Sequence, residues 1–251
     1  MNPSTTKNKL FPILRGIAVL AVCLGIWQLL ALAVSNSYFL PDVAETAAAL
    51  IKLAGKGDFY LKILISLLRV AAGLIIGIVC GVLLGTVSYL LPSAHAFVSP
   101  IISVMKATPI AAIILILWFT FTDASLAIFV VFLMVTPVIW QNVYDGFKAI
   151  PTELREVCEA YEVSFVTKLR ILVIPTVMRY FIPATVTSIG LAWKAEIAAE
   201  IMTYSNIGRS IQDFKTLSYD TASVFAWASA IIAMSMILEY VAKLLIRRIR
   251  L

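Results

Sequence analysis

The sequence predicts an all-α protein that crosses a lipid bilayer about six times. Of its 251 residues, 61% are hydrophobic and only 14% are charged, and the mean hydropathy is +0.98. Soluble proteins carry roughly 25% charged residues, so this chain has too few charges to cover a water-exposed surface. Its apolar residues are gathered into runs near the roughly 20 residues that a helix needs to cross a bilayer. We therefore expect one transmembrane domain over residues 1–251 and exclude a soluble globular protein.

Six apolar runs are long enough to cross the bilayer, and they cover residues 11–34, 61–90, 97–119, 124–143, 172–202 and 222–246. The first run could be mistaken for a signal peptide, because basic residues precede it and Ala31-Leu32-Ala33 resembles a cleavage site. Its apolar stretch is longer than the signal-peptide core of roughly 7 to 15 residues. We expect a retained helix that follows a cytoplasmic N-terminus at 1–10.

The segment between the first two runs predicts a short helix on the outer surface of the membrane. Asp42 follows Pro41 and is itself followed three residues later by Glu45, which is the pattern of a capping box. Residues 47–53 are mostly good helix formers. We expect this helix to lie along the surface rather than to cross the bilayer.

Glycines mark one face of the second run. Gly73, Gly77, Gly81 and Gly85 recur every fourth residue, so they share one narrow side of a helix. Small residues in such a row let another backbone approach closely. A general tolerance of membrane helices for glycine explains one or two of them better than four in register. We predict a tight contact between helices.

The third run carries a lysine between two prolines. Lys106 lies between Pro100 and Pro109, which should weaken or bend the helix and free backbone carbonyls. A broken helix beside a buried cation is typical of a transport pathway. An ordinary packing kink is an equally good interpretation.

Orientation follows from the positive charges. If the N-terminus is cytoplasmic, twelve lysines and arginines fall on the inner side and six on the outer side, with Lys106 and Lys194 left out because they lie deep in the runs. Cytoplasmic loops carry the excess of positive charge. Both termini are therefore expected in the cytoplasm.

The longest inner connection, 145–170, predicts two short helices. Pro151 suits the first helical position. The apolar residues after it have the i, i+3, i+4, i+7 spacing of an amphipathic helix, and they are Leu154, Val157, Cys158 and Tyr161. Ser164 can cap the second helix. From the residues alone, the pair either lies on lipid headgroups or docks a cytoplasmic partner.

Ionisable side chains inside the fifth run are candidates for function, because charges in a membrane are costly. Glu196 and Glu200 share one helix face and repel each other, so either one of them is protonated or a cation neutralises them, from Lys106 or from the Lys194 of a second copy. They form a structural ion network, line a translocation path together with Lys106 and Lys194, or lie near the outer surface. Trp193 is either a wall of that path or an interfacial anchor.

Several classes of function lack their signatures. Cys23, Cys80 and Cys158 have no paired spacing and His95 is the single histidine, which argues against metal and disulfide sites. The 20 basic and 14 acidic residues are spread between apolar runs, unlike a nucleic-acid-binding stripe. No P-loop is present, since the nearest fragment, 55–57, lacks its first Gly and its Ser or Thr. A membrane enzyme would show a cluster of reactive side chains, and the sequence has none. A self-sufficient channel or secondary transporter would show an inverted repeat, and the sequence has no convincing one.

The loop also resembles a known family. Residues 153–162 (ELREVCEAYE) and 168–175 (KLRILVIP) are similar to the EAA loop of ABC importer permeases. Residues 190–194 (GLAWK), 198–200 (AAE) and 38–41 (YFLP) resemble the nitrate, sulfonate, taurine and bicarbonate branch of that family. Two departures stand out in the loop. Glu156-Val157-Cys158 replaces Glu-Ala-Ala, and Glu162 replaces a glycine whose left-handed backbone would strain a glutamate.

The resemblance implies a type I importer of the bacterial cytoplasmic membrane. Two permease chains, expected here as a homodimer, would work with two cytoplasmic ATPase subunits and an external solute-binding protein, with ATP and Mg²⁺ on the ATPase and no cofactor in this chain. The residues expected to couple to the ATPase are Leu154, Glu156, Val157, Cys158, Tyr161, Glu162 and Phe165. The resemblance also suggests a small anion as solute. A cationic or neutral metabolite stays open, because carboxylates in the spans repel an anion.

Overall fold

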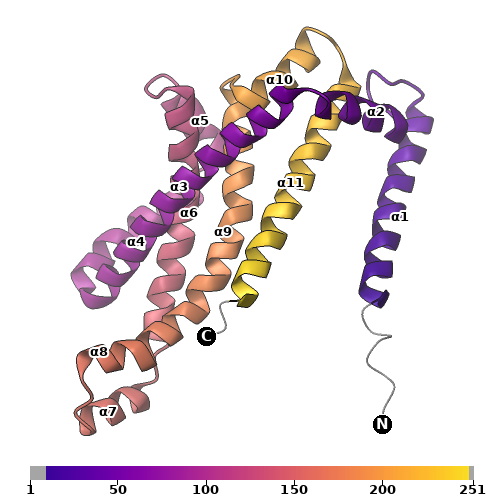
Figure 1. The fold of residues 1–251 in the computed structure, drawn as a ribbon. Helices are drawn as coiled ribbons and strands as arrows, with labels where there is room; N and C mark the ends of the chain where they lie inside the picture. The colour runs from indigo at the N-terminus through magenta and orange to yellow at the C-terminus, as the bar shows by residue number, and fades with distance from the viewer. Residues whose placement is uncertain (1–9, 249–251) are drawn as a thin grey trace, which may run out of the picture. The chain divides into compact units, whose positions relative to one another are not determined.

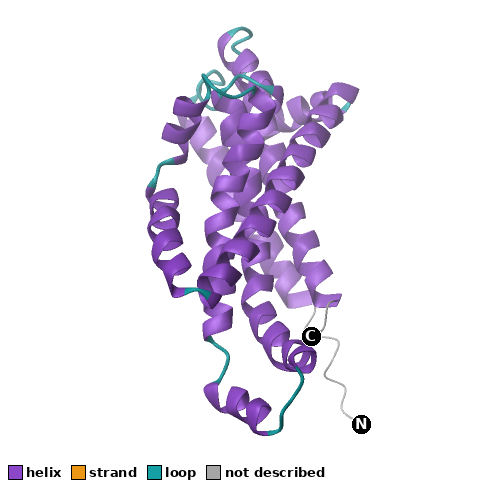
Figure 2. Cartoon of the chain, turned by 90° about the vertical axis from the view of Figure 1, so that its left-hand side faces the viewer, coloured by secondary structure: helices purple, strands orange, loops and turns teal. Residues whose placement is uncertain are grey.

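A computed structural model describes residues 10–248, and these residues are helical without any strand (Figures 1 and 2). The expected cytoplasmic N-terminus at 1–10 lies outside the described residues, except for Leu10. Packing divides the chain into two compact units, of which the first comprises 1–60 with 211–230 and the second 61–210 with 231–251. The loop, the glycine row and the charged residues of the fifth run all belong to the second unit.

Most apolar runs form single long helices. In chain order the helices are α1 (Leu10–Val34), α2 (Val43–Ala54), α3 (Gly57–Leu90), α4 (Pro92–Ala107), α5 (Ile110–Leu117), α6 (Asp123–Lys148), α7 (Thr152–Ala160), α8 (Phe165–Lys168), a π-helical turn (Leu169–Val173), α9 (Ile174–Met202), α10 (Asn206–Thr216) and α11 (Thr221–Arg248). Among the described residues, five helices are long and apolar enough to cross a membrane, and six if α4 and α5 count as one bent span. The all-α prediction is confirmed.

The third apolar run is not one straight span. The structure breaks it into α4 and α5, which meet at an angle of 96°. Pro109 causes the break, because it has no N–H to donate and disfavours a helical conformation at Thr108. Thr108 is accordingly extended, with φ −78° and ψ 125°. Pro100 lies inside α4 without interrupting it. The predicted bend is confirmed, and it divides the run 97–119 between two helices.

In the first unit, the predicted short helix is present as α2. The Asp42 side chain accepts a hydrogen bond from the backbone N–H of Glu45 at 2.7 Å, and the Glu45 side chain accepts one from the N–H of Asp42 at 3.1 Å. This reciprocal pair is the capping box that the sequence predicted. The Trp27 indole of α1 donates to the carbonyl of Pro41 at 3.1 Å, which ties α1 to the start of α2.

In the second unit, the glycine row of α3 packs on α6. An added Cβ would lie within 2.6–3.0 Å of the Cβ of a branched α6 residue at each position, and the pairs are Gly73 with Val131, Gly77 with Val135, Gly81 with Ile139 and Gly85 with Val143. Such distances are shorter than van der Waals contact, so only glycine permits this approach. The predicted tight helix contact is confirmed.

One helix was not predicted from the sequence. Helix α10 follows α9 after a short turn, where only a connection between apolar runs was expected. It is short and largely polar, so a search for apolar runs does not detect it. Its first turns bury Ile207, Gly208 and Ser210.

We expect Gly77→Ala to destabilise the protein by about 1–3 kcal/mol, because the new methyl group would overpack a filled interface. The thermal unfolding midpoint of the detergent-solubilised chain, followed by tryptophan fluorescence, measures the effect. Gly25→Ala in α1 is the matched control, since nothing lies within 4 Å of a Cβ at Gly25. An equal change in both variants would contradict the packing argument.

Candidate functional site

The loop 145–170 folds into the predicted pair of short helices. Figures 1 and 2 show α7 and α8 beyond the end of α6 and the start of α9. Pro151 is the residue before the first helical position of α7 rather than that position itself. Ser164 caps α8, where its hydroxyl accepts from the N–H of Thr167 at 3.4 Å.

Glu162 makes the turn between these helices in a left-handed conformation, with φ 48°. The N–H of Val163 donates to the carbonyl of Cys158 at 2.9 Å, and the N–H of Glu162 donates to that of Glu159 at 3.1 Å. These two bonds form a Schellman motif, which commonly has glycine at the left-handed position. The turn forms without glycine, and the glutamate holds a backbone conformation that is unfavourable for its side chain.

The loop helices expose most of their apolar side chains. Leu154 and Val157 are each 50% exposed, Tyr161 is 80% exposed and Phe165 is 77% exposed. Glu156 is also exposed. Cys158 differs from them, because it is buried against Ile150 and Leu172 beneath the loop. Its predicted place on the docking surface is therefore corrected: Cys158 fixes the hidden face of α7.

Polar and aromatic contacts anchor the loop to the helix ends. The Arg155 guanidinium donates to the Tyr89 hydroxyl at the end of α3, and the Tyr89 ring stacks on Phe147 of α6 at 4.8 Å. Lys168 of α8 pairs with Glu159 of α7 at 3.1 Å. The loop that carries the exposed apolar side chains is therefore attached to the ends of α3 and α6.

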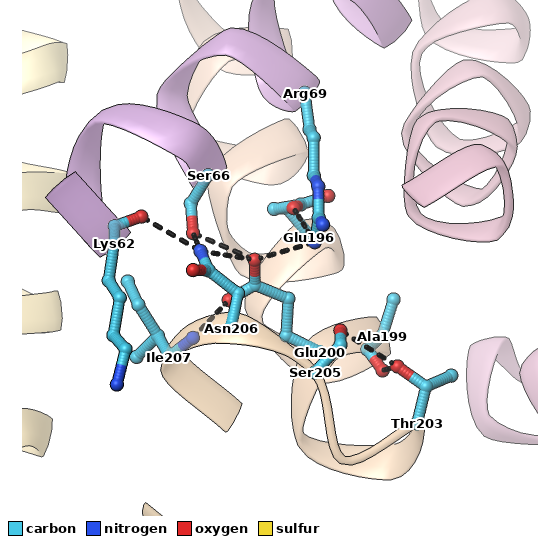
Figure 3. A network of polar contacts seen from close by, with 10 residues as sticks. All are labelled: Lys62, Ser66, Arg69, Glu196, Ala199, Glu200, Thr203, Ser205, Asn206 and Ile207. Carbon is cyan, nitrogen blue, oxygen red and sulfur yellow. Dashed lines mark hydrogen bonds and ion pairs between the residues drawn. The ribbon is translucent and has the colours of Figure 1, made fainter. Parts of the chain in front are cut away.

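A second polar site lies near the other end of α9, around Glu200 (Figure 3). Glu200 is fully buried and its carboxylate accepts four hydrogen bonds. One oxygen accepts from Ser66 at 2.8 Å, Arg69 at 3.0 Å and Asn206 at 2.9 Å, and the other accepts from the N–H of Ile207 at 3.1 Å. A buried carboxylate with this many donors is compensated for its loss of water.

Glu196 shares the same cation but lacks hydrogen bonds. Its carboxylate is fully buried, lies 3.9 Å from Arg69 and has no hydrogen-bond partner. The cation beside both carboxylates is therefore Arg69, and not Lys106 or Lys194 as expected. Lys106 donates to Gln141 at 3.2 Å, and Lys194 is exposed on another side of α9.

The turn from α9 into α10 is built around this ion cluster, which we define as Arg69, Glu196 and Glu200. Asn206 begins α10 with φ 44°, a left-handed conformation that asparagine tolerates, and its side chain reaches Glu200 and Ser66. A Cβ on Gly208 would overlap the backbone carbonyl of Glu200, so α10 lies directly on the end of α9.

The sequence reasoning missed the roles of Ser66, Arg69, Asn206 and Gly208. Arg69 was the available signal, because it is a charged residue within the second apolar run. Trp193 is 1% exposed and donates to the carbonyl of Ile231 at 3.0 Å. In this structure Trp193, Glu196 and Glu200 are all enclosed by the chain, and none of them is open to a pathway.

Comparison with known proteins shows to which family the chain belongs. Residues 73–251 match the model of the binding-protein-dependent transport system inner membrane component family. The chain belongs to this family of ABC importer permeases. The matched region includes the loop, α9 and the two carboxylates of the ion cluster.

Relatives and solved structures agree with this assignment. The permease is 25% identical to the Bacillus subtilis protein named as an aliphatic sulfonates transport permease, SsuC, over 85% of this chain and 78% of that one. It is 31% identical to the nitrate import permease NrtB of Synechococcus elongatus, over 78% and 74% of the two chains. A chain of the inward-facing MetNI methionine ABC transporter has the same fold, with a TM-score of 0.64 at 14% identity, over 75% of this chain and 94% of that one. The predicted type I importer fold is confirmed.

We expect Glu200→Gln to destabilise the permease by about 2 kcal/mol, because it leaves the partly buried Arg69 without its close anionic partner. Glu196→Gln removes only the more distant charge and a like-charge repulsion within α9, so its unfolding free energy should stay within about 1 kcal/mol of wild type. Thermal unfolding of both variants in detergent tests the difference. Equal losses would show that the two carboxylates are equivalent.

We expect Glu162→Gly to stabilise the loop by about 1 kcal/mol, because glycine adopts the left-handed conformation without steric cost. Amide hydrogen exchange across residues 157–163 should slow about fivefold, because a stabilisation of about 1 kcal/mol lowers the equilibrium constant for local opening by that factor. Glu156→Gly, inside α7, is the opposite control and should speed exchange by a similar factor. Faster exchange in Glu162→Gly would contradict the assignment of the turn.

Proposed function

We propose that this permease is the membrane subunit of an ATP-driven importer and that its loop 145–170 docks on a cytoplasmic ATPase. The observation that carries the proposal is the docking surface, defined as Leu154, Val157, Tyr161 and Phe165. These four apolar side chains are exposed, and α7 buries its other face through Cys158, which packs against Ile150 and Leu172. An exposed apolar patch on a fixed support is typical of a protein interface.

The exposed carboxylates of α7 and of the turn after it favour a protein partner over lipid headgroups. Four glutamates surround the docking surface, and all four are exposed: Glu153, Glu156, Glu159 and Glu162. Glu159 pairs with Lys168, and the negative surface charge of a cytoplasmic leaflet repels the other three carboxylates from the headgroups. A groove on a partner protein that is apolar inside and basic at its rim would fit both features.

The remaining parts of the importer follow from the family. The asymmetry of lysine and arginine supports a cytoplasmic loop with both termini on the same side of the cytoplasmic membrane. Permeases of this family work with external binding proteins, and we propose such a partner here together with a second copy of this chain. ATP and Mg²⁺ would bind to the ATPase, which supplies the energy for opening and closing the spans.

The solute we propose is a small anion. The names of the relatives refer to aliphatic sulfonates, nitrate and bicarbonate. The ion cluster weakens the electrostatic objection to an anion, because Glu196 and Glu200 are enclosed beside Arg69. Lys106 and Lys194 keep exposed side chains, and we propose that they face the translocation path. Trp193, Glu196 and Glu200 would support its wall from within the chain.

Val157→Asp and Tyr161→Asp test the docking surface. We expect each variant to lose at least about tenfold in affinity for the ATPase, because a desolvated carboxylate in an apolar contact costs more than 1.4 kcal/mol. Co-purification of the ATPase and stimulation of its turnover measure the loss.

Ile51→Asp on α2, whose side chain is 74% exposed, is the matched control and should leave ATPase binding unchanged. Gel filtration confirms that each variant is folded. Full ATPase binding by both loop variants would overturn the proposal, and solute flux through the purified permease alone would favour a self-sufficient channel or secondary transporter.

A further inference from the structure

A groove with mostly apolar walls and three charged side chains lies on the side of α9 that faces away from the ion cluster. Its volume is about 310 Å³, and its lining comes from α9 and from the second half of α11: Val186, Thr187, Gly190, Leu191, Lys194, Glu239 and Lys243. All of these residues belong to the second unit. Small-molecule sites begin at roughly 300 Å³, so the groove has room for a small solute and little more.

The groove holds one more positive charge than negative charge. Lys243 pairs with Glu239 at 3.6 Å, one turn apart on α11. Lys194 is exposed in the groove and makes no hydrogen bond or ion pair with any described residue. An unpaired ammonium group inside an apolar span is costly, so it requires water or an anion beside it.

Gly190 holds the acidic residue of the groove in place. A Cβ at Gly190 would lie 2.8 Å from a carboxylate oxygen of Glu239, so α9 has no side chain where that carboxylate lies. Glu239 is thus held between the α9 backbone and Lys243. Glu239 forms an ion pair with Lys243, so Lys194 is the cation of the groove that has no anionic partner.

The other carboxylates of α9 do not cancel this charge. Glu196 and Glu200 are fully buried and lie beside Arg69, which comes from α3. Helix α9 therefore separates these charges, with both anions enclosed beside a guanidinium and Lys194 exposed in a groove on its other side. An electropositive groove with apolar walls concentrates small anions.

From this charge separation we propose that the groove is a binding site for a small oxyanion, with the Lys194 ammonium as its main ligand and Lys243 as a second cation at its edge. The inference rests on the proposed function, because it takes the small anion carried by that importer as the ligand. It goes further by naming the residues and the charge that hold the solute. A nitrate, a bicarbonate or the sulfonate group of a larger solute has the required chemistry.

The test is a reporter thiol at Thr187, which lines the groove and is exposed. Thr187→Cys is made in the full chain in open membrane fragments, with Cys23, Cys80 and Cys158 replaced by alanine. The rates of reaction with sulfonatoethyl and trimethylammonioethyl methanethiosulfonate are compared, each divided by its rate with a free thiol. We expect the anionic reagent to react faster, and nitrate, methanesulfonate or bicarbonate to slow the reaction of an uncharged reagent.

The charge of Lys194 should set this preference. Lys194→Gln is expected to lower the anion-to-cation rate ratio about tenfold, the effect of one charge a few ångströms away in a partly desolvated groove. Lys194→Arg, which keeps the charge, is the matched control and should keep the ratio. A thiol that does not react, that prefers the cationic reagent, that ignores Lys194→Gln or that none of the three anions protects would overturn the proposal.

This readout needs neither ATP nor transport, so it separates the two proposals. If the ATPase does not bind the docking surface but the thiol shows an anion preference set by Lys194, the groove stands without the importer mechanism. If the ATPase binds and the thiol shows no such preference, the importer stands and the solute is held elsewhere.

Discussion

The hydrogen bonding of one buried carboxylate, Glu200, organises the end of α9. Removing a charge from water costs several kcal/mol unless donors replace the lost hydration. Here the donors come from α3 and from the first two residues of α10, so satisfying the charge brings α3 and α10 together at the end of α9. The absent side chain of Gly208 allows the close approach that this bonding needs. In a chain that lacked any of these partners, the same buried charge would destabilise the fold.

Helix α9 connects the two sites of the permease. The loop precedes its first residue, Ile174, and the ion cluster includes Glu196 and Glu200 near its last turns. Its 29 residues correspond to a length of about 43 Å, at roughly 1.5 Å for each residue. A displacement of the loop would therefore reach the ion cluster along α9. The π-helical turn at Leu169–Val173 joins the loop to α9, and such turns are places where a helix can change its hydrogen-bonding pattern.

The sequence predicted the features that depend on neighbouring residues. The apolar runs, the capping box at Asp42, the glycine row and the two loop helices each follow from local spacing, and the structure contains all of them. The partner of Glu200 did not follow from spacing, because Arg69 is 131 residues away and nothing local indicates that they meet. The 96° angle between α4 and α5 is likewise set by packing, whereas the position of the break is set by Pro109. Helix α10 is too short and polar for a search based on hydropathy.

The glycine row has a mechanical consequence for alternating access. The branched residues of α6 fit into notches one helical turn apart along α3, so sliding either helix by a single residue, about 1.5 Å, would drive a β-branched side chain into backbone. Helices α3 and α6 are thus locked in register and travel together as a rigid block. The hinges of a transport cycle must then be sought outside this block, at the elbow between α4 and α5 and at the base of α9.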